Sequence, residues 1–283
     1  MIVFQAVISI SSVVLQNCIL NKVCKKDLST TNHVYRFNAL MYAVCIILFG
    51  ILAISGGFSL FTAALGLLFG VVTALSNYYK MLSLSTGPMH ITLLITTSSM
   101  IIPTMSGVFF GESFSLPKLC LVFVLIFFIY LSLEKQNGAK IKGRWLVFCA
   151  LAFIFQGSIG VLQKVHQSSS HKGESGSFLL IAFICSFIYS IIRTKKGFKA
   201  LNFTKKHCIF AFVCGICTFI MNFLNLHLSG LLPSQLFFPL INGSAIVLSS
   251  LASIILFKEK LNKKQIIGLC GGILSLVAIC LVK

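Results

Sequence analysis

Apolar runs close to 20 residues long recur along the whole chain, with only short polar connections between them. A helix needs about 20 apolar residues to cross roughly 30 Å of hydrocarbon. Helices suit such runs because lipid leaves no water to satisfy backbone polar groups. We therefore expect ten transmembrane helices, over residues 2–21, 36–55, 59–80, 89–110, 116–133, 145–165, 176–193, 207–229, 234–257 and 264–282.

The composition agrees with a multi-pass membrane protein and leaves no room for a soluble domain. Apolar residues make up 57% of the chain and charged residues only 10%, whereas soluble domains average about 25% charged. The formal net charge of +18 does not indicate nucleic-acid binding, because the basic residues lie in short loops beside apolar runs. Anionic lipid headgroups and the positive-inside bias account for them.

Polar residues recur at a constant offset of 145 residues between the two parts of the chain. Gly70, Thr73, Asn77 and Pro88 reappear as Gly215, Thr218, Asn222 and Pro233. In the same register, His90 and Thr97 correspond to Gln235 and Asn242, and a slip of two residues aligns Glu112 with Glu259. Spacings of three and seven residues place such side chains on one helix face, so the recurrence predicts a duplicated fold.

The duplication divides the chain into residues 1–137 and 138–283, each holding five predicted spans. Because five is odd, the second half enters the membrane inverted relative to the first. The predicted fold is an all-α integral membrane protein of ten transmembrane helices, built as two inverted five-helix repeats. Inverted repeats around a midplane polar site are typical of secondary transporters.

Loop charge predicts the orientation. The odd-numbered loops hold 19 of the 23 Lys and Arg residues, the exceptions being Lys118, Lys164, Lys172 and Lys283. The positive-inside rule places these loops in the cytoplasm. We therefore expect a multi-pass protein of the cell (plasma) membrane with both termini on the non-cytoplasmic side.

The chain has only five acidic residues, and none lies in the middle of a predicted span. This argues against a buried acid–base pair, a carboxylate metal cage or a carboxylate cation site. We expect no catalytic residue, no metal and no cofactor. Glu112 and Glu259 are interpreted as interfacial charges near helix N-termini, with a role as proton carriers as the alternative.

Amides, hydroxyls and imidazoles are the polar groups inside the spans, and they must face other helices or a wet cavity because lipid cannot satisfy them. The predicted substrate-binding residues are Asn17, Asn77, His90, Thr97, Gln156, Asn222, Gln235 and Asn242. The alternative for each is interhelical hydrogen bonding without a ligand. Pro103 and Pro239 are expected to free the carbonyls of Ser99 and Gln235 for ligand contact.

One further pattern ends the second half. It runs from Pro239-Leu240-Ile241-Asn242-Gly243 through Lys258-Glu259-Lys260-Leu261-Asn262 to Gln265, Gly268 and Gly272, with a weaker copy at Gly111-Glu112-Ser113-Phe114-Ser115. It resembles the drug/metabolite transporter (DMT) superfamily, in its ten-helix EamA-type branch. The resemblance implies alternating access around a cavity lined by both halves. The first span lacks the glutamate that related small multidrug transporters use for proton exchange.

We therefore expect a secondary active transporter, not an enzyme, that moves a small polar or zwitterionic metabolite such as an amino acid or amine. Its partners would be that substrate and membrane lipids, with a coupling ion or proton left open, in a monomer or homodimer. A flippase for lipid-linked substrates is the alternative within transport. A membrane-embedded enzyme and a non-transporting partner subunit are the alternatives outside it.

Overall fold

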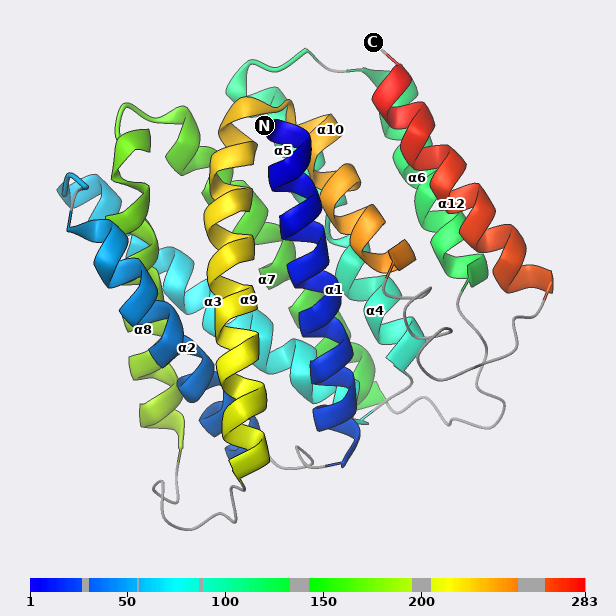
Figure 1. Cartoon of the computed structure of the whole chain (residues 1–283). Helices are drawn as coiled ribbons and strands as arrows, with labels where there is room; N and C mark the ends of the chain where they lie inside the picture. The colour runs from blue at the N-terminus through cyan, green and yellow to red at the C-terminus, as the bar shows by residue number, and fades with distance from the viewer. Residues whose placement is uncertain are drawn as a thin grey trace.

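The chain folds into a bundle of helices, seen in a computed structural model (Figure 1). The structure describes residues 1–26, 31–54, 56–86, 89–113, 115–132, 143–194, 205–248 and 263–282, and these contain helices and turns but no strand. An α-helical fold was expected from the apolar runs, and this part of the prediction is confirmed.

The first half of the chain contains α1 (Ile2–Lys26), α2 (Thr31–Ala53), α3 (Leu60–Thr86), α4 (Met89–Ser98), α5 (Ile101–Ser106), η1 (Gly107–Phe110) and α6 (Leu116–Ser132). The second half contains α7 (Gly143–Ser168), η2 (Lys172–Glu174), α8 (Ser175–Arg193), α9 (Lys205–Leu231), α10 (Ser234–Phe238), η4 (Pro239–Gly243) and α12 (Lys263–Leu281).

Six helical segments within the described residues are long and apolar enough to cross a membrane: those in α1, α2, α3, α7, α9, and η2 with α8. Shorter apolar helical segments occupy the positions of the other four predicted spans, at Ile95–Phe110, Leu116–Leu131, Ser234–Leu248 and Ile266–Leu281. The long apolar helices fit a multi-pass membrane protein. The number of crossings, ten, remains a prediction.

The fourth predicted span is not one continuous helix. It breaks between Ser98 and Ile101 into α4 and α5, ahead of Pro103. We expected Pro103 to leave the Ser99 carbonyl free, and this prediction was wrong. The carbonyl accepts a 3.0 Å hydrogen bond from the N–H of Ile102, because the break lets the chain close a tighter turn. In the ninth predicted span, α10 gives way at Pro239 to the π-helical η4.

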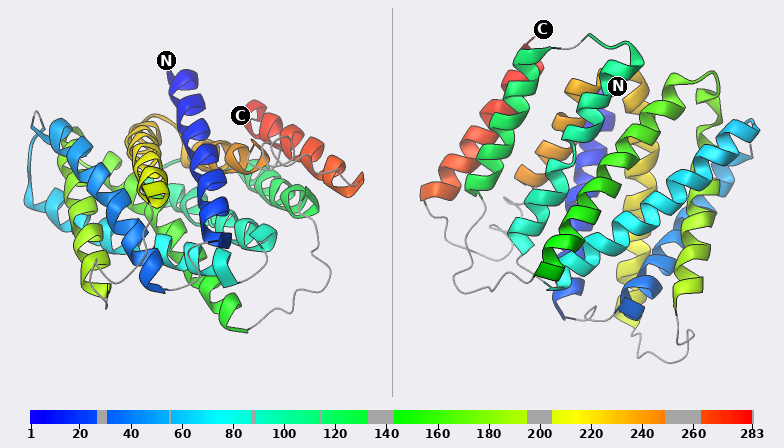
Figure 2. Two further views of the ribbon diagram at one scale, coloured as in Figure 1. Left: turned by 60° about the horizontal axis from the view of Figure 1, so that its bottom comes forward. Right: turned by 180° about the vertical axis from the view of Figure 1, so that it is seen from behind.

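The described connections and both termini gather at one end of the bundle, which we call the terminal end. It holds the α2–α3 turn, the η1–α6 turn, η2 and the α9–α10 turn (Figure 1). Helix α1 runs away from this end, whereas α7 runs towards it, as the rotated views also show (Figure 2).

Helices of each half of the chain pack against helices of the other half. Helix α3 packs on α7 and α8, while α9 packs on α1 and α2. The pairs α2–α8, α6–α12 and α5–α10 each join one predicted half to the other. The same arrangement of neighbours therefore surrounds α3 in the first half and α9 in the second.

Two corresponding glycines illustrate this packing between the halves. A Cβ on Gly70 would collide with the carbonyl oxygen of Ala182 in α8, and one on Gly215 would lie 2.9 Å from the carbonyl oxygen of Met41 in α2. The carbonyl of Gly70 accepts a 2.8 Å hydrogen bond from Ser186, and that of Gly215 accepts one from the Cys45 thiol at 3.4 Å. Each glycine lets two helices approach closely.

Candidate functional site

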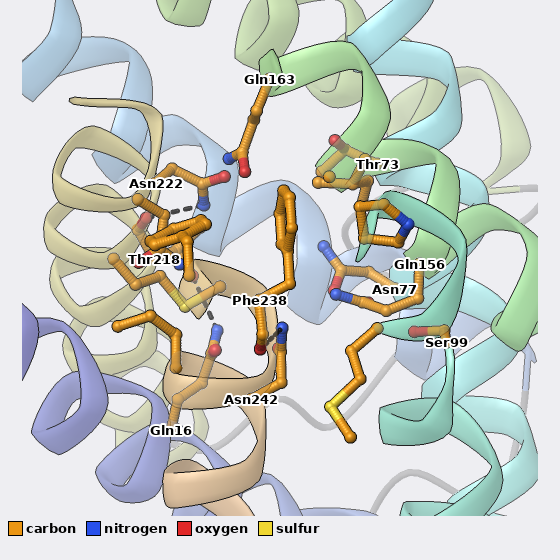
Figure 3. Close-up of a pocket in the computed structure, with 18 residues that line it drawn as sticks. Gln16, Thr73, Asn77, Ser99, Gln156, Gln163, Thr218, Asn222, Phe238 and Asn242 are labelled. Carbon is orange, nitrogen blue, oxygen red and sulfur yellow. Dashed lines mark hydrogen bonds between the residues drawn. The ribbon is translucent and has the colours of Figure 1, made fainter. Parts of the chain in front are cut away.

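A polar cavity of about 70 Å³ lies inside the bundle (Figure 3). Its walls come from α1, α3, the α4–α5 break with α5, α7, α9, and α10 with η4. These are the six predicted spans from which the predicted substrate-binding residues come. The volume is room for a few water molecules or a small polar ligand.

Amide side chains dominate the polar part of the wall: Gln16, Asn77, Gln156, Gln163, Asn222, Asn225 and Asn242. The hydroxyls of Thr73, Ser99 and Thr218 join them, and Phe237, Phe238, Met100, Met221 and Pro103 supply apolar surface. In Figure 3 the ring of Phe238 stands between Asn222 with Thr218 on one side and Asn77 with Gln156 on the other. No charged side chain lines the cavity within the described residues.

Helices α3 and α9 present the repeated polar pair to the cavity. Thr73 and Asn77 lie one turn apart on α3, as Thr218 and Asn222 do on α9. Side chains four residues apart share a helix face, so each pair points the same way. The recurrence that predicted a duplication thus marks the two walls of one cavity.

The two asparagines use different hydrogen-bond partners. Asn77 Nδ2 donates to the hydroxyl of Tyr42 at 2.8 Å, whereas Asn222 Nδ2 donates to the carbonyl of Thr218 in its own helix at 2.9 Å. Tyr42 packs against Phe183, with ring centroids 5.7 Å apart.

Hydrogen bonds between side chains tie the walls together. Gln16 Nε2 in α1 donates to Thr218 Oγ1 in α9 at 2.7 Å, and Thr218 Oγ1 donates to the Cys214 carbonyl at 2.7 Å. On the opposite wall, Ser76 Oγ in α3 donates to Gln156 Oε1 in α7 at 2.9 Å.

Four of the eight predicted binding residues line this cavity: Asn77, Gln156, Asn222 and Asn242. Asn17, Thr97 and Gln235 do not. His90 belongs to the first turn of α4, and its side chain lies outside the part that the structure describes.

Asn17 does not line the cavity because of its position around the axis of α1. Consecutive residues are turned about 100° around a helix axis, so Gln16 faces the cavity and Asn17 points away. The Oδ1 of Asn17 accepts a 3.2 Å hydrogen bond from the ammonium of Lys80. Of the two adjacent amides, Gln16 lines the cavity, and a binding role for Asn17 stays a prediction.

Thr97 and Gln235 lie outside the cavity for separate reasons. The break after Ser98 brings Ser99 to the wall in place of Thr97. Gln235 precedes Asn242 by seven residues, about 10 Å along a helix. Its Oε1 accepts a 3.0 Å hydrogen bond from the Ser115 N–H near the terminal end.

Several wall residues were missed as binding residues although the sequence marked them. Thr73 and Thr218 are members of the repeat, and Gln163 follows Gln156 by two helical turns. Met221 and Phe238 carry no sequence signal, since each is one apolar residue among many in its predicted span. Only the packing of helices reveals them as part of the wall.

A largely buried ion pair lies near the cavity at the terminal end. The Lys164 ammonium pairs with the Glu112 carboxylate, and the two side chains are 8% and 17% exposed. Lys164 also donates to the Ser229 carbonyl at 2.9 Å, and Glu112 Oε2 accepts from the Ser234 N–H at 2.7 Å. Glu112 therefore lies at a helix N-terminus, but at that of α10 and not that of the next helix. Glu259 lies outside the described residues.

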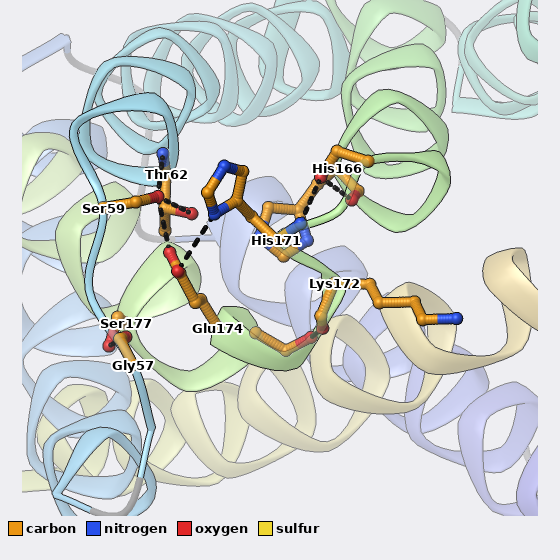
Figure 4. Close-up of polar contacts among 10 residues, drawn as sticks. Gly57, Ser59, Thr62, His166, His171, Lys172, Glu174 and Ser177 are labelled. Carbon is orange, nitrogen blue, oxygen red and sulfur yellow. Dashed lines mark hydrogen bonds and ion pairs between the residues drawn. The ribbon is translucent and has the colours of Figure 1, made fainter.

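A second polar cluster also lies at the terminal end (Figure 4). Glu174 Oε2 accepts from the Ser59 hydroxyl at 2.7 Å, and Glu174 Oε1 lies 3.1 Å from His171 Nδ1. Ser177 Oγ donates to the Gly57 carbonyl at 2.7 Å. These contacts hold the α2–α3 turn against η2 and α8. Within the described residues, no three His, Cys, Asp or Glu side chains gather to hold a metal ion.

Comparison with known proteins identifies the fold and not the family. No protein-family model matches the chain, and no curated protein matches it either. Among solved structures, 28 chains match. One, described only as "Crystal structure of protein", aligns with a TM-score of 0.74 over 98% of this chain and 96% of its own, at 12% identity. At that identity the likeness concerns the fold alone.

Proposed function

We propose that this chain is a secondary active transporter of the plasma membrane with ten transmembrane helices in two inverted halves. It moves a small polar or zwitterionic metabolite, such as an amino acid or amine, by alternating access. The resemblance to EamA-type drug/metabolite transporters agrees with this proposal. Both termini then lie on the non-cytoplasmic side.

One observation carries the proposal. A single polar cavity receives Thr73 and Asn77 from α3 and Thr218 and Asn222 from α9. Symmetric contributions from two halves are what a site inside an inverted-repeat transporter requires, because rocking one half against the other exposes it to either side. The packing of α3 on helices of the second half, and of α9 on helices of the first, supports the same architecture.

Counterflow into proteoliposomes tests the proposal. Liposomes loaded in turn with unlabelled amino acids, amines, nucleosides or sugars would be given the labelled compound outside. We expect accumulation of at least one compound, and its loss when Asn77 and Asn222 are both replaced by Ala. Normal transport by a well-reconstituted double variant rejects the site. Translocation of a labelled polyprenyl-linked substrate alone would indicate a flippase instead.

A further inference from the structure

The walls of the cavity contain hydrogen-bonding groups whose direction is set by the protein itself. The Nδ2 groups of Asn222 and Asn242 donate to the backbone carbonyls of Thr218 and Phe238, at 2.9 and 3.0 Å. A carbonyl can only accept, so neither amide can turn round without losing its bond. The Oδ1 atom of each is therefore left to accept from a ligand, and each Nδ2 keeps a second N–H that can donate.

Gln16 is oriented by a longer chain of bonds. Its Nε2 donates to Thr218 Oγ1, and the single proton of that hydroxyl is already donated to the Cys214 carbonyl. Thr218 can therefore only accept from Gln16. Gln16 Oε1, like the Oδ1 atoms of Asn222 and Asn242, accepts no hydrogen bond from the described part of the chain.

Three other groups of the wall can adapt: the side chains of Asn77, Gln156 and Thr73. Asn77 and Gln156 are bonded to hydroxyls, of Tyr42 and Ser76, which can donate or accept, so these amides can present either end. Thr73 is 4% exposed, and its hydroxyl has no partner within the described residues. The three amides with a fixed direction, Gln16, Asn222 and Asn242, thus each leave an oxygen to accept from a ligand. The adaptable groups can meet either a donor or an acceptor of the ligand.

Charge gives a second constraint. Neither a cation nor a carboxylate lines the described cavity, so a charged ligand would shed water without gaining a counter-ion, which costs several kcal/mol per ion. An anion would also face the fixed oxygens of Gln16, Asn222 and Asn242. Hydroxyl and amide N–H groups lose less on burial and are satisfied by those oxygens.

We propose that the cavity selects an uncharged ligand carrying several O–H or N–H donors, such as a polyol, a sugar or a primary amide. This inference rests on the proposed transport function and replaces the amino acid or amine named there with an uncharged polar substrate. It places charged amines, carboxylates and zwitterions below neutral compounds of the same size.

Two matched series test the selection by the thermal stability of the detergent-purified protein. One comprises lactamide, lactate, 1-aminopropan-2-ol and alanine, and the other glucose, glucuronate and glucosamine. A ligand stabilises the folded protein by mass action. We expect the neutral member of at least one series to bind about tenfold more tightly than its charged relatives. Equal or tighter binding of a charged or zwitterionic member, or no binding of either neutral member, overturns the inference.

Variants add readouts that do not depend on the identity of the natural substrate. Asn77→Asp replaces the donor to the Tyr42 hydroxyl with an acceptor, to which that hydroxyl can donate instead. The variant adds one negative charge to the wall, so preference should move from the neutral to the ammonium member of a series. Gln167→Glu adds the same charge outside the cavity and should leave the preference unchanged. Thr73→Val should weaken binding of the neutral member several-fold without lowering stability of the ligand-free protein. An unchanged preference in Asn77→Asp overturns the inference.

The tests separate this inference from the proposed function. Alanine that binds and shows counterflow would keep the transporter and remove the preference for neutral ligands. Binding of lactamide or glucose without any counterflow would keep the cavity chemistry and remove the transporter.

Discussion

Lys164 in α7 and Glu112 beyond η1 form an ion pair that joins the two predicted halves at the terminal end of the cavity. The same carboxylate accepts from the first N–H of α10, and the same ammonium donates to the carbonyls of Ser229 in α9 and of Leu232 just beyond it. Two charges thus hold four segments together, one turn beyond the cavity residue Gly160.

The pair should be costly to break on one side only. Glu112→Gln leaves the buried ammonium without a counter-charge, and we expect a loss of about 3–5 kcal/mol in unfolding free energy. Lys164→Met should cost a similar amount, and the double variant should lose less than the sum of the two. Denaturant unfolding in detergent measures this. As a control, Lys172→Met replaces an exposed lysine and should change stability by only about 0.5 kcal/mol. Strict additivity of the two losses in the Glu112/Lys164 double variant would contradict the coupling.

The glycines at α3 and α9 should not tolerate a methyl group. Gly70→Ala places a Cβ against the Ala182 carbonyl, and Gly215→Ala places one 2.7 Å from the Cβ of Val44. Each helix pair must then separate, at an expected cost of about 1–3 kcal/mol. Gly50→Ala is the matched control, because nothing lies within 4 Å of its Cβ position and alanine favours the helix. Equal melting temperatures for the three variants would reject the close-packing argument.

The corresponding threonines should respond differently to loss of the hydroxyl. Thr218→Val removes the acceptor of the buried Gln16 amide, which should cost about 1–3 kcal/mol. Thr73→Val removes a hydroxyl without a described partner and should leave stability of the ligand-free protein near the original value or above it. Melting temperatures of the two variants measure the difference. A larger loss for Thr73→Val would show that its hydroxyl has a structural role.

The orientation can be read by labelling. In a cysteine-free background, Ser113→Cys lies in the η1–α6 turn and Lys205→Cys at the start of α9, both exposed. A membrane-impermeant maleimide added to intact cells should label Ser113→Cys and spare Lys205→Cys. The reverse pattern would place both termini in the cytoplasm and contradict the loop-charge prediction.

The pattern of neighbouring residues in the sequence was enough to predict the helices and the polar face that α3 and α9 share. The apolar runs required helices because lipid offers no other partner for the backbone. The spacing of Thr73 with Asn77, and of Thr218 with Asn222, required each pair to share a helix face. Those four residues line the cavity, since a shared face is a property of one helix alone.

The packing of helices against one another decided the features of the site that involve more than one helix. Whether Gln16 or Asn17 faces the cavity follows from the rotation of α1 against α9, which one helix cannot specify. The break at Ser99 sets which residue of that span reaches the wall. The partnership of Lys164 with Glu112 joins residues 52 positions apart, and no periodicity relates them. Sequence determined the helices and their polar faces because hydrogen bonding and side-chain spacing act locally, whereas pairing and rotation arise only when helices pack.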